Sequence, residues 1–203
     1  MMALSRKERD KQLRRSDIFK AAEHLFAVKG YHKATIRDIA KEAQYAIGTV
    51  YLHFKDKEDL YFALLEEKLK SLIFISKEKT GQTKGAKEKL EICVQESLNF
   101  FENNQNFFQI FISEQNDTIA ERKVMGSSIG AEMDQYMVDL IKYAQSHGVI
   151  SRDFNAEQIA DVFVSILKTI SLKWLKKKSS EKESLIAFSD VIIRLFLNGA
   201  ANR

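Results

Sequence analysis

The sequence predicts an all-α protein of about nine helices. The chain has 203 residues, no proline and only 8 glycines, so little in it fixes φ or removes a backbone donor. Apolar residues recur at helical spacing over most of the length, and no stretch alternates apolar with polar residues as a half-buried strand does. With 45% hydrophobic and 30% charged residues, the chain is not expected to be disordered.

Helix starts are indicated by capping signals, in which a Ser, Thr, Asp or Asn is followed three residues later by an acidic residue or Gln. These pairs are Thr35 with Asp38, Asp56 with Asp59, Thr118 with Glu121, Asn155 with Gln158, and Ser180 with Glu183. Gly30 and Gly148 indicate helix ends, and residues 79–84 are expected to form a loop. In chain order, we expect helices over residues 18–29, 35–43, 47–53, 56–78, 86–103, 107–111, 118–147, 155–176 and 180–198.

Two glycines fall inside the helix expected over residues 118–147. Gly126 and Gly130 each cost about 1 kcal/mol relative to alanine in a helix. We therefore expect a kink or a break in that helix near these two positions.

Positive charge is concentrated at the N-terminus. Residues 1–57 hold 13 Lys and Arg against 7 Asp and Glu, whereas the remaining 146 residues hold 19 against 21. This asymmetry indicates an anionic partner for the N-terminal part, with nucleic acid favoured over a membrane surface. We therefore predict a domain over residues 1–57, with a basic N-terminal arm, and a second over residues 58–203.

The segments that would direct the chain to a membrane or out of the cell are not seen. No run approaches the roughly 18 apolar residues of a membrane span, and the basic, polar start does not resemble a secretory signal. A cytoplasmic protein without membrane contact is therefore expected.

Motifs that carry catalysis or metal binding are absent from the sequence. None of the four histidines follows an acidic residue by three positions, as in helical metal sites. Phosphate-loop, dinucleotide-binding and nucleophile-elbow patterns are also missing. Cys93 lies between Ile92 and Val94, where a buried structural thiol is favoured over a nucleophile. We therefore expect no enzymatic activity, no metal and no cofactor.

The most specific segment runs from Thr35 to Leu60 and reads TIRDIAKEAQYAIGTVYLHFKDKEDL. Two short helices joined by a tight turn, followed by a longer helix, are typical of a helix-turn-helix that presents its second helix to the DNA major groove. Val50 and Phe54 are expected to pack against the first helix. The residues left for DNA contact are Thr35, Tyr45, Ala46, Ile47, Gly48, Thr49, Tyr51, Leu52, His53, Lys55 and Lys57.

Different chemistry is expected from different members of this set. Thr35 and the free amides that follow it form an anion site at a helix start, and lysines and polar side chains suit phosphate contact. Thr49 can hydrogen bond to base edges, Gly48 allows close approach, and Ile47 or Ala46 can touch a thymine methyl group. Taken alone, Tyr51 and His53 also fit ordinary surface positions.

The segment GTVYLHFKDKEDL, together with FKAAEHLFAVKGYHKATIRDIAKEA before it, resembles the TetR family of bacterial transcriptional regulators. The resemblance covers roughly residues 16–65, about a quarter of the chain. It implies an N-terminal three-helix DNA-binding domain and a larger helical domain for ligand binding and dimerisation. It also implies a palindromic double-stranded operator and, usually, repression that a small molecule relieves.

Two positions depart from the family pattern. Gln44 stands where the family commonly has a glycine in the turn, and Ala46 stands where it has a capping serine. A non-glycine residue at positive φ is uncommon, so either the turn is strained or its path differs. These departures are also the support for an alternative, an all-helical ligand-binding or interaction protein that no longer binds DNA specifically.

Aromatic residues and methionines gather in the C-terminal part, where they fit either a core or the lining of an effector site. As a group they favour an apolar small molecule over a sugar. A long-chain acyl compound is preferred to a lipophilic cation. The candidate lining residues are Phe100, Phe107, Phe108, Phe111, Met133, Tyr136, Met137, Phe163 and Trp174.

The last two expected helices, over about residues 155–198, carry apolar residues on more than one face. Such helices need more than one neighbour to cover them. A homodimer with a four-helix interface is favoured over burial within one chain, and the family resemblance implies the same arrangement.

Overall fold

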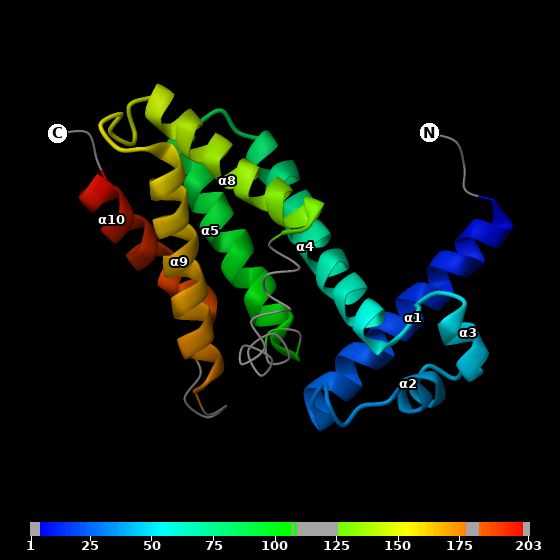
Figure 1. Cartoon of the computed structure of the whole chain (residues 1–203). Coiled ribbons are helices and arrows are strands. Elements are labelled where there is room, and N and C mark those ends of the chain that lie inside the picture. The colour runs from blue at the N-terminus through cyan, green and yellow to red at the C-terminus, as the bar shows by residue number, and fades with distance from the viewer. Residues whose placement is uncertain (1–4, 107, 109–125, 178–182, 201–203) are drawn as a thin grey trace. The chain divides into compact units, whose positions relative to one another are not determined.

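The computed structural model describes residues 5–106, 108, 126–177 and 183–200. Within these ranges the protein is all-helical, as predicted, and its helices are shown in Figure 1. The elements are α1 (Arg6–Lys29), α2 (Ile36–Glu42), α3 (Ile47–Tyr51), α4 (Lys57–Gly81), α5 (Ala86–Asn103), α8 (Ser128–Ser146), α9 (Ala156–Leu175), the 3₁₀ turn η3 (Leu185–Phe188) and α10 (Ser189–Ala200).

The chain divides into two compact units. Unit 1 comprises residues 1–67 and 106–122, and unit 2 comprises residues 68–105 and 123–203. Residues of α4 belong to both units. Whether function divides at residue 57, as the charge distribution suggests, stays a prediction.

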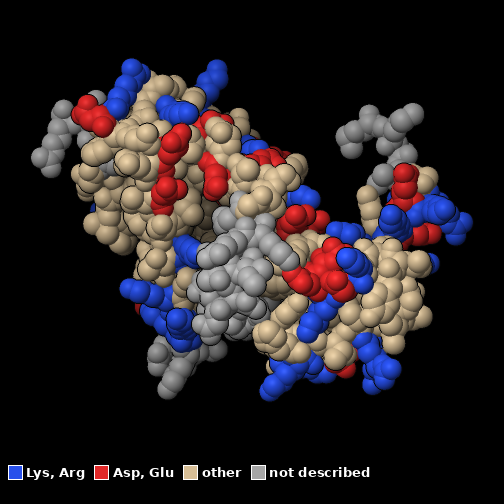
Figure 2. Space-filling view, in the orientation of Figure 1, with Lys and Arg blue, Asp and Glu red and all other residues tan. Residues whose placement is uncertain are grey.

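Helix α1 begins earlier than the sequence predicts. Its N-cap is Ser5, whose hydroxyl accepts a hydrogen bond from the Glu8 amide at 3.3 Å, while the Glu8 carboxylate accepts from the Ser5 amide at 2.9 Å. This capping box satisfies two amides that a helix start leaves free. The segment expected to be a basic arm is therefore helical from Arg6, and Lys and Arg side chains gather on it at the N-terminal end of α1 (Figure 2).

The core of unit 1 joins the first four helices. Helix α1 ends at Gly30, where φ is 79° and the amide donates to the Phe26 carbonyl at 2.9 Å. Rings then pack across the unit, with centroids 5.3 Å apart for Phe19 and Phe54 and 5.9 Å apart for Phe26 and Tyr61. Aromatic pairs at these spacings add to the stabilisation that burial itself provides.

Helix α4 begins as the Asp56–Asp59 signal predicts, because the Asp56 carboxylate accepts from the Asp59 amide at 2.8 Å. It continues to Gly81, so the loop expected over residues 79–84 begins later than predicted. Thr80 explains the difference. Its side chain is buried, and its hydroxyl donates to the Ser76 carbonyl at 2.7 Å one turn earlier, which keeps the last turn helical.

Unit 2 is a bundle in which α5 packs against α8, α9 and α10. Figure 1 shows α5, α9 and α10 lying side by side. Its core is one cluster of buried residues that includes Leu90, Leu98, Ile141, Phe163 and Phe196. The predicted cap at Asn155 is confirmed, since its side chain accepts from the amides of Glu157 and Gln158 at 2.9 and 3.1 Å.

The break expected near Gly126 and Gly130 is confirmed. Helix α8 begins at Ser128, after a turn at Gly126, and its N-cap Ser127 accepts from the Gly130 amide at 3.3 Å. The last helix was expected from Ser180, but Glu183 lies outside any helix and α10 follows η3. Most of the expected helix over residues 107–111, and the Thr118–Glu121 signal, lie outside the described residues.

Within the part of the chain that the structure describes, no helix is both long enough and apolar enough to cross a membrane.

Candidate nucleic-acid interface

The turn between α2 and α3 takes the conformation that a glycine usually provides. Gln44 has φ 59°, and no other non-glycine residue in the described ranges has a positive φ. The turn is closed by hydrogen bonds from the Gln44 amide to the Lys41 carbonyl at 3.1 Å and from the Tyr45 amide to the Ala40 carbonyl at 2.9 Å. A left-handed conformation costs about 1–2 kcal/mol for a residue with a Cβ. Of the two sequence alternatives, the structure therefore supports a strained turn.

The N-cap of α3 is Ala46, in extended conformation and without a side-chain hydrogen bond. A serine in this conformation accepts from an amide in the first turn of the helix, and a missing cap costs about 1 kcal/mol. Ala46→Ser is therefore expected to raise the free energy of unfolding by about 1 kcal/mol. Chemical denaturation measures it, with Ala46→Val as the control that adds bulk but no acceptor. Equal stabilisation by both substitutions would contradict the capping explanation.

Helix α3 has a buried face and an exposed face. Val50 and, just beyond the helix, Phe54 are buried, as the sequence predicted. On the other side Tyr51 is 54% exposed and Leu52 81% exposed. Ile47, Gly48 and Ala46 are also exposed, and Thr49 is half-buried. The motif thus offers a short helical surface that this chain itself leaves uncovered.

Gly48 is not required by the packing of the free protein. A Cβ placed on it meets no atom of the described residues within 4 Å, and its φ is not in the left-handed region. Neither strain nor crowding in the described part of the chain therefore explains a glycine here, and its role in close approach to DNA stays a prediction.

The start of α2 is fixed by a second capping box. The Thr35 hydroxyl accepts from the Asp38 amide at 3.1 Å, and the Asp38 carboxylate accepts from the Thr35 amide at 3.2 Å. The Thr35 hydroxyl also donates to the Asp38 carboxylate at 2.9 Å, and this bond, followed by the bond from the Thr35 amide, lowers the pKa of Asp38. The capping box that the sequence predicted is confirmed, and Thr35 itself remains exposed.

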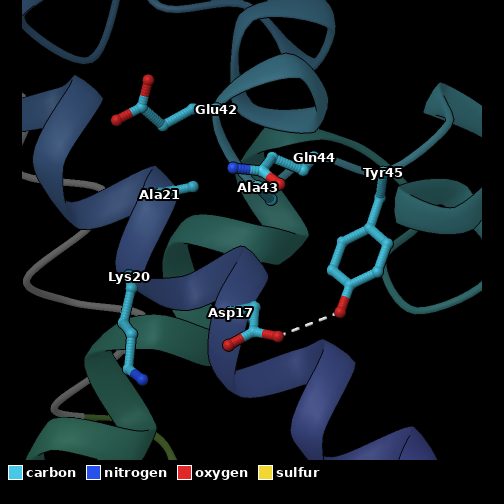
Figure 3. Close-up of a pocket in the computed structure, with 7 residues that line it drawn as sticks. All are labelled: Asp17, Lys20, Ala21, Glu42, Ala43, Gln44 and Tyr45. Carbon is cyan, nitrogen blue, oxygen red and sulfur yellow. Dashed lines mark hydrogen bonds between the residues drawn. The ribbon is translucent and has the colours of Figure 1, made fainter.

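Tyr45 is directed toward α1. Its hydroxyl donates to the Asp17 carboxylate at 2.9 Å, and this bond raises the pKa of Tyr45 (Figure 3). The pair lies at a hollow of about 510 Å³ that Lys20 and Gln44 also line. A DNA contact by Tyr45 stays a prediction, because its polar atom already has a partner on α1.

His53 and Lys55 follow α3. His53 is half-buried, and its Nδ1 atom is buried without a hydrogen-bond partner among the described residues. The pKa of His53 is lowered by burial and by the charges of Lys11, Arg15 and Arg14. Lys55 is exposed, and its backbone amide donates to the Asp59 carboxylate at 2.8 Å.

The sequence suggested that the Lys57 side chain contacts a DNA phosphate, but in the structure it is bound within its own chain. Its ammonium group donates to the carbonyl oxygens of Tyr31, His32 and Ala34 at 2.9, 3.3 and 3.1 Å. It also lies 4.4 Å from the centre of the Tyr31 ring. All three protons are thus directed at the loop between α1 and α2, so Lys57 joins that loop to the start of α4.

Lys57→Met is expected to lower the free energy of unfolding by about 1–3 kcal/mol, because three carbonyls lose a charged donor. Thermal unfolding measures this loss. The salt dependence of DNA binding should stay unchanged. Its neighbour Lys55 is the matched control, since Lys55→Met removes the same charge from an exposed position. A fall of about one in the salt slope for Lys57→Met, without lost stability, would instead assign Lys57 to phosphate contact.

The residues predicted to line an effector site lie largely in the core of unit 2. Phe163 is fully buried, with its ring 4.6 Å from that of Phe196. Met133 is half-buried, and the Tyr136 hydroxyl lies 3.2 Å from that of Thr80. Phe107 and Phe111 lie outside the described residues, and Phe108 is buried in unit 1. The remaining members are buried, namely Phe100, Met137 and Trp174.

From the sequence, the N-terminal run of Lys and Arg is interpreted as a solvated arm, with phosphate or minor-groove contact as the alternative; its helical structure and its place beside the end of α3 were not predicted. The first turns of α1 place Arg6, Lys7, Lys11 and Arg14 along a hollow of about 590 Å³ that Leu52 and His53 also line. The signal that places these residues on a helix is the spacing of Ser5 and Glu8, which is a capping box. No apolar repeat follows that pair, so the pattern of apolar residues alone does not indicate a helix there.

Two short helices joined by a tight turn, with one face of the second left exposed, define a helix-turn-helix DNA-binding protein. Residues 18–64 match the family model described as bacterial regulatory proteins, tetR family. Residues 18–64 therefore form a DNA-binding domain of the TetR family, and the chain is a transcriptional regulator.

Full-length comparisons agree with this assignment. The chain is 26% identical over 198 residues to the "Fatty acid metabolism regulator protein" of Bacillus subtilis (strain 168). The aligned region covers 92% of this chain and 95% of that protein. This relative is a regulator rather than an enzyme.

Solved structures share the fold over nearly the whole chain. The fatty acid degradation regulator FadR of Bacillus halodurans superposes with a TM-score of 0.84 at 23% identity, covering 94% of this chain and 97% of that one. The B. subtilis regulator FadR in complex with stearoyl-CoA gives 0.82 at 24% identity, covering 91% and 98%. A TetR-family regulator from Rhodococcus sp. gives 0.75 at 21% identity, covering 93% and 98%.

Proposed function

We propose that this protein is a repressor that binds a palindromic operator through the exposed face of α3 and is released by a long-chain acyl-CoA. The observation that carries the proposal is the division of α3 into a buried side at Val50 and an exposed side at Gly48 and Tyr51. We assign residues 1–57 to DNA binding and residues 58–203 to ligand binding and dimerisation.

In the proposed complex α3 lies in the major groove, which is about 12 Å wide and admits one helix. Thr49 hydrogen bonds to base edges, and Gly48 permits the close approach. Ala46 or Ile47 touches a thymine methyl group. Phosphate contacts come from the exposed polar groups around the helix, namely Thr35, Tyr51, His53 and Lys55.

The double variant Thr49→Ala, Tyr51→Ala tests this assignment. DNA is first selected from a random-sequence library with the wild-type protein, and the selected site is then compared with a scrambled duplex. The double variant should lose most of its preference for the selected site. Unchanged specific affinity would contradict the assignment. Failure of the wild type to select any site would favour the alternative, a helical ligand-binding protein without specific DNA binding.

Two features support an acyl-CoA as the effector. The interior of unit 2 is apolar and aromatic, with Phe100, Met137, Phe163 and Trp174 buried. Its full-length relative is a fatty acid metabolism regulator, and one protein of the same fold binds stearoyl-CoA. Phe107, Phe111, Met133 and Tyr136 stay in the proposed lining set.

Stearoyl-CoA is therefore the probe for the effector. It should weaken operator binding, and by linkage the operator should weaken stearoyl-CoA binding by the same factor. Fluorescence anisotropy with labelled operator and calorimetry with stearoyl-CoA measure the two factors. Free coenzyme A serves as the control without an acyl chain, and equal effects of both compounds would contradict an acyl effector.

A homodimer through α9 and α10 is supported by an apolar stripe on unit 2. On α10, Val191 is 51% exposed and Leu195 is 70% exposed, four residues apart on one face. On α9, Val162 is 50% exposed. A second copy would cover these side chains and form the four-helix interface.

A dimer also explains, in physical terms, how ligand binding releases the protein from its operator. The two recognition helices must match half-sites about 34 Å apart, so a small change in their separation weakens specific binding. Light scattering at micromolar concentration should give the dimer mass for the wild type and a lower mass for Leu195→Glu. A monomeric wild type would contradict this part of the proposal. As an operator-binding protein, it is proposed to act in the cytoplasm.

A further inference from the structure

The first turns of α1 carry cations that their own chain does not neutralise. Lys7, Lys11 and Arg14 follow one another at spacings of four and three residues, which places them on one face of the helix. Among the residues that the structure describes, none of the three has a carboxylate within ion-pair distance. The charge of this face is therefore available to an external anion.

This basic face lies alongside the recognition helix. The hollow that Lys7, Lys11 and Arg14 line is completed by Leu52 and His53, which directly follow α3, and by Arg6 and Asp10. Four cations against one carboxylate leave its lining net positive. Electrostatics agrees with the geometry. Arg14 lowers the pKa of His53 and also acts on that of Tyr45, just before α3. The cations of α1 thus reach both ends of the helix proposed to read DNA.

We infer that this groove, between the first turns of α1 and the end of α3, binds the DNA phosphate backbone beside the major groove that α3 occupies. The inference rests on the proposed function and adds to it a second anchoring surface on α1. From Arg6 to Arg14 the helix advances about 12 Å, and one DNA strand carries a phosphate per about 3.4 Å of helix axis. The groove is therefore long enough for more than one phosphate.

A phosphate contact has a signature that a merely solubilising charge lacks. Each contact contributes about 0.9 to the slope of log affinity against log salt, because it releases a condensed counterion. It contributes the same amount on every sequence, since phosphates carry no sequence information. Loss of the groove should therefore weaken binding to selected and scrambled DNA equally.

The test is the triple variant Lys7→Gln, Lys11→Gln, Arg14→Gln, compared with the wild type on the selected site. For each phosphate that the variant no longer neutralises, the slope of log affinity against log salt concentration should decrease in magnitude by about 0.9. The affinity at 0.1 M salt should then decrease roughly eightfold. The ratio of selected to scrambled binding should stay as in the wild type. Duplexes with a single neutral methylphosphonate then map the contact, because the triple variant should be insensitive at positions where the wild type loses affinity.

The matched control is the triple variant Lys84→Gln, Lys87→Gln, Lys142→Gln, which removes the same net charge. All three positions are exposed in unit 2, outside the proposed interface. A wild-type salt slope in the groove variant, or an equal loss in the control, would overturn the inference. A wild type that binds no DNA site would instead overturn the proposed function itself.

His53 provides a second readout in the same groove. Without DNA its pKa is lowered by burial and by Lys11, Arg15 and Arg14, which favours the neutral ring, and Asp10 is the carboxylate that lines the same hollow. A phosphate beside it offsets those cations and raises the pKa, so DNA binding takes up a proton. Affinity should therefore increase as the pH falls from 7.5 toward about 6. The increase should be absent in His53→Gln and smaller in the groove variant, and an equal increase in all three proteins would overturn the inference.

Discussion

Replacing Gly48 with leucine is expected to abolish specific DNA binding while leaving the protein at least as stable as the wild type. A Cβ added here meets no atom of the described residues within 4 Å, so the free protein leaves room for a side chain to begin. Leucine also favours helix over glycine by up to about 1 kcal/mol. In the proposed complex the same position faces the floor of the major groove, where the added side chain keeps α3 from its base contacts. We expect operator affinity to fall at least about a hundredfold, toward the value for scrambled DNA.

Thermal unfolding and operator titration of Gly48→Leu separate the two effects. Gly48→Ala is the graded control, since it adds a single methyl group and should lose less affinity than leucine does. Wild-type operator affinity in Gly48→Leu would mean that this face of α3 does not lie against DNA.

Phe54→Ala is expected to have the largest effect on stability, with a loss of about 3–5 kcal/mol. Phe54 is 2% exposed and packs against the Phe19 ring, and the Arg15 guanidinium lies 4.9 Å from its ring centre. Removing the ring leaves a cavity in the small core that holds α3 on α1. DNA affinity should be lost with the fold of unit 1.

Circular dichroism during thermal unfolding measures this loss, and Phe54→Leu is the control that keeps most of the buried volume. Leucine should cost clearly less than alanine. Equal small losses for both variants would contradict a packing role for Phe54.

The helix-turn-helix was predictable because its signals are local. The Thr35–Asp38 capping box lies within one helical turn, and so does the spacing of the buried Val50 and Phe54. The sequence also identified the unusual turn at Gln44, although only the structure shows that the left-handed conformation is kept. Each of these features depends on residues within a few positions of one another.

What the sequence did not reveal depends on residues that are distant along the chain. Lys57 was assigned to phosphate because its type and position suit it, but its protons reach carbonyls in a loop more than 20 residues earlier. Thr80 suggested a loop by composition, and burial between helices keeps it helical. The basic groove likewise needs α1 and the end of α3 to come together, which no local pattern predicts.

The effector site was the least predictable feature, for a physical reason. Phe163 and Trp174 were candidates because they are large and apolar, but the same properties suit a core, and both are buried in the core of unit 2. Nothing in the spacing of aromatic residues along a helix distinguishes a core from the lining of a ligand site.

The measurement that tests the central claim most directly is the affinity of the wild-type protein for its selected site and for a scrambled duplex at one salt concentration. Specific recognition by the α2–α3 motif predicts a difference of at least about a thousandfold that Gly48→Leu abolishes. Equal affinities for the two duplexes at physiological salt would contradict it.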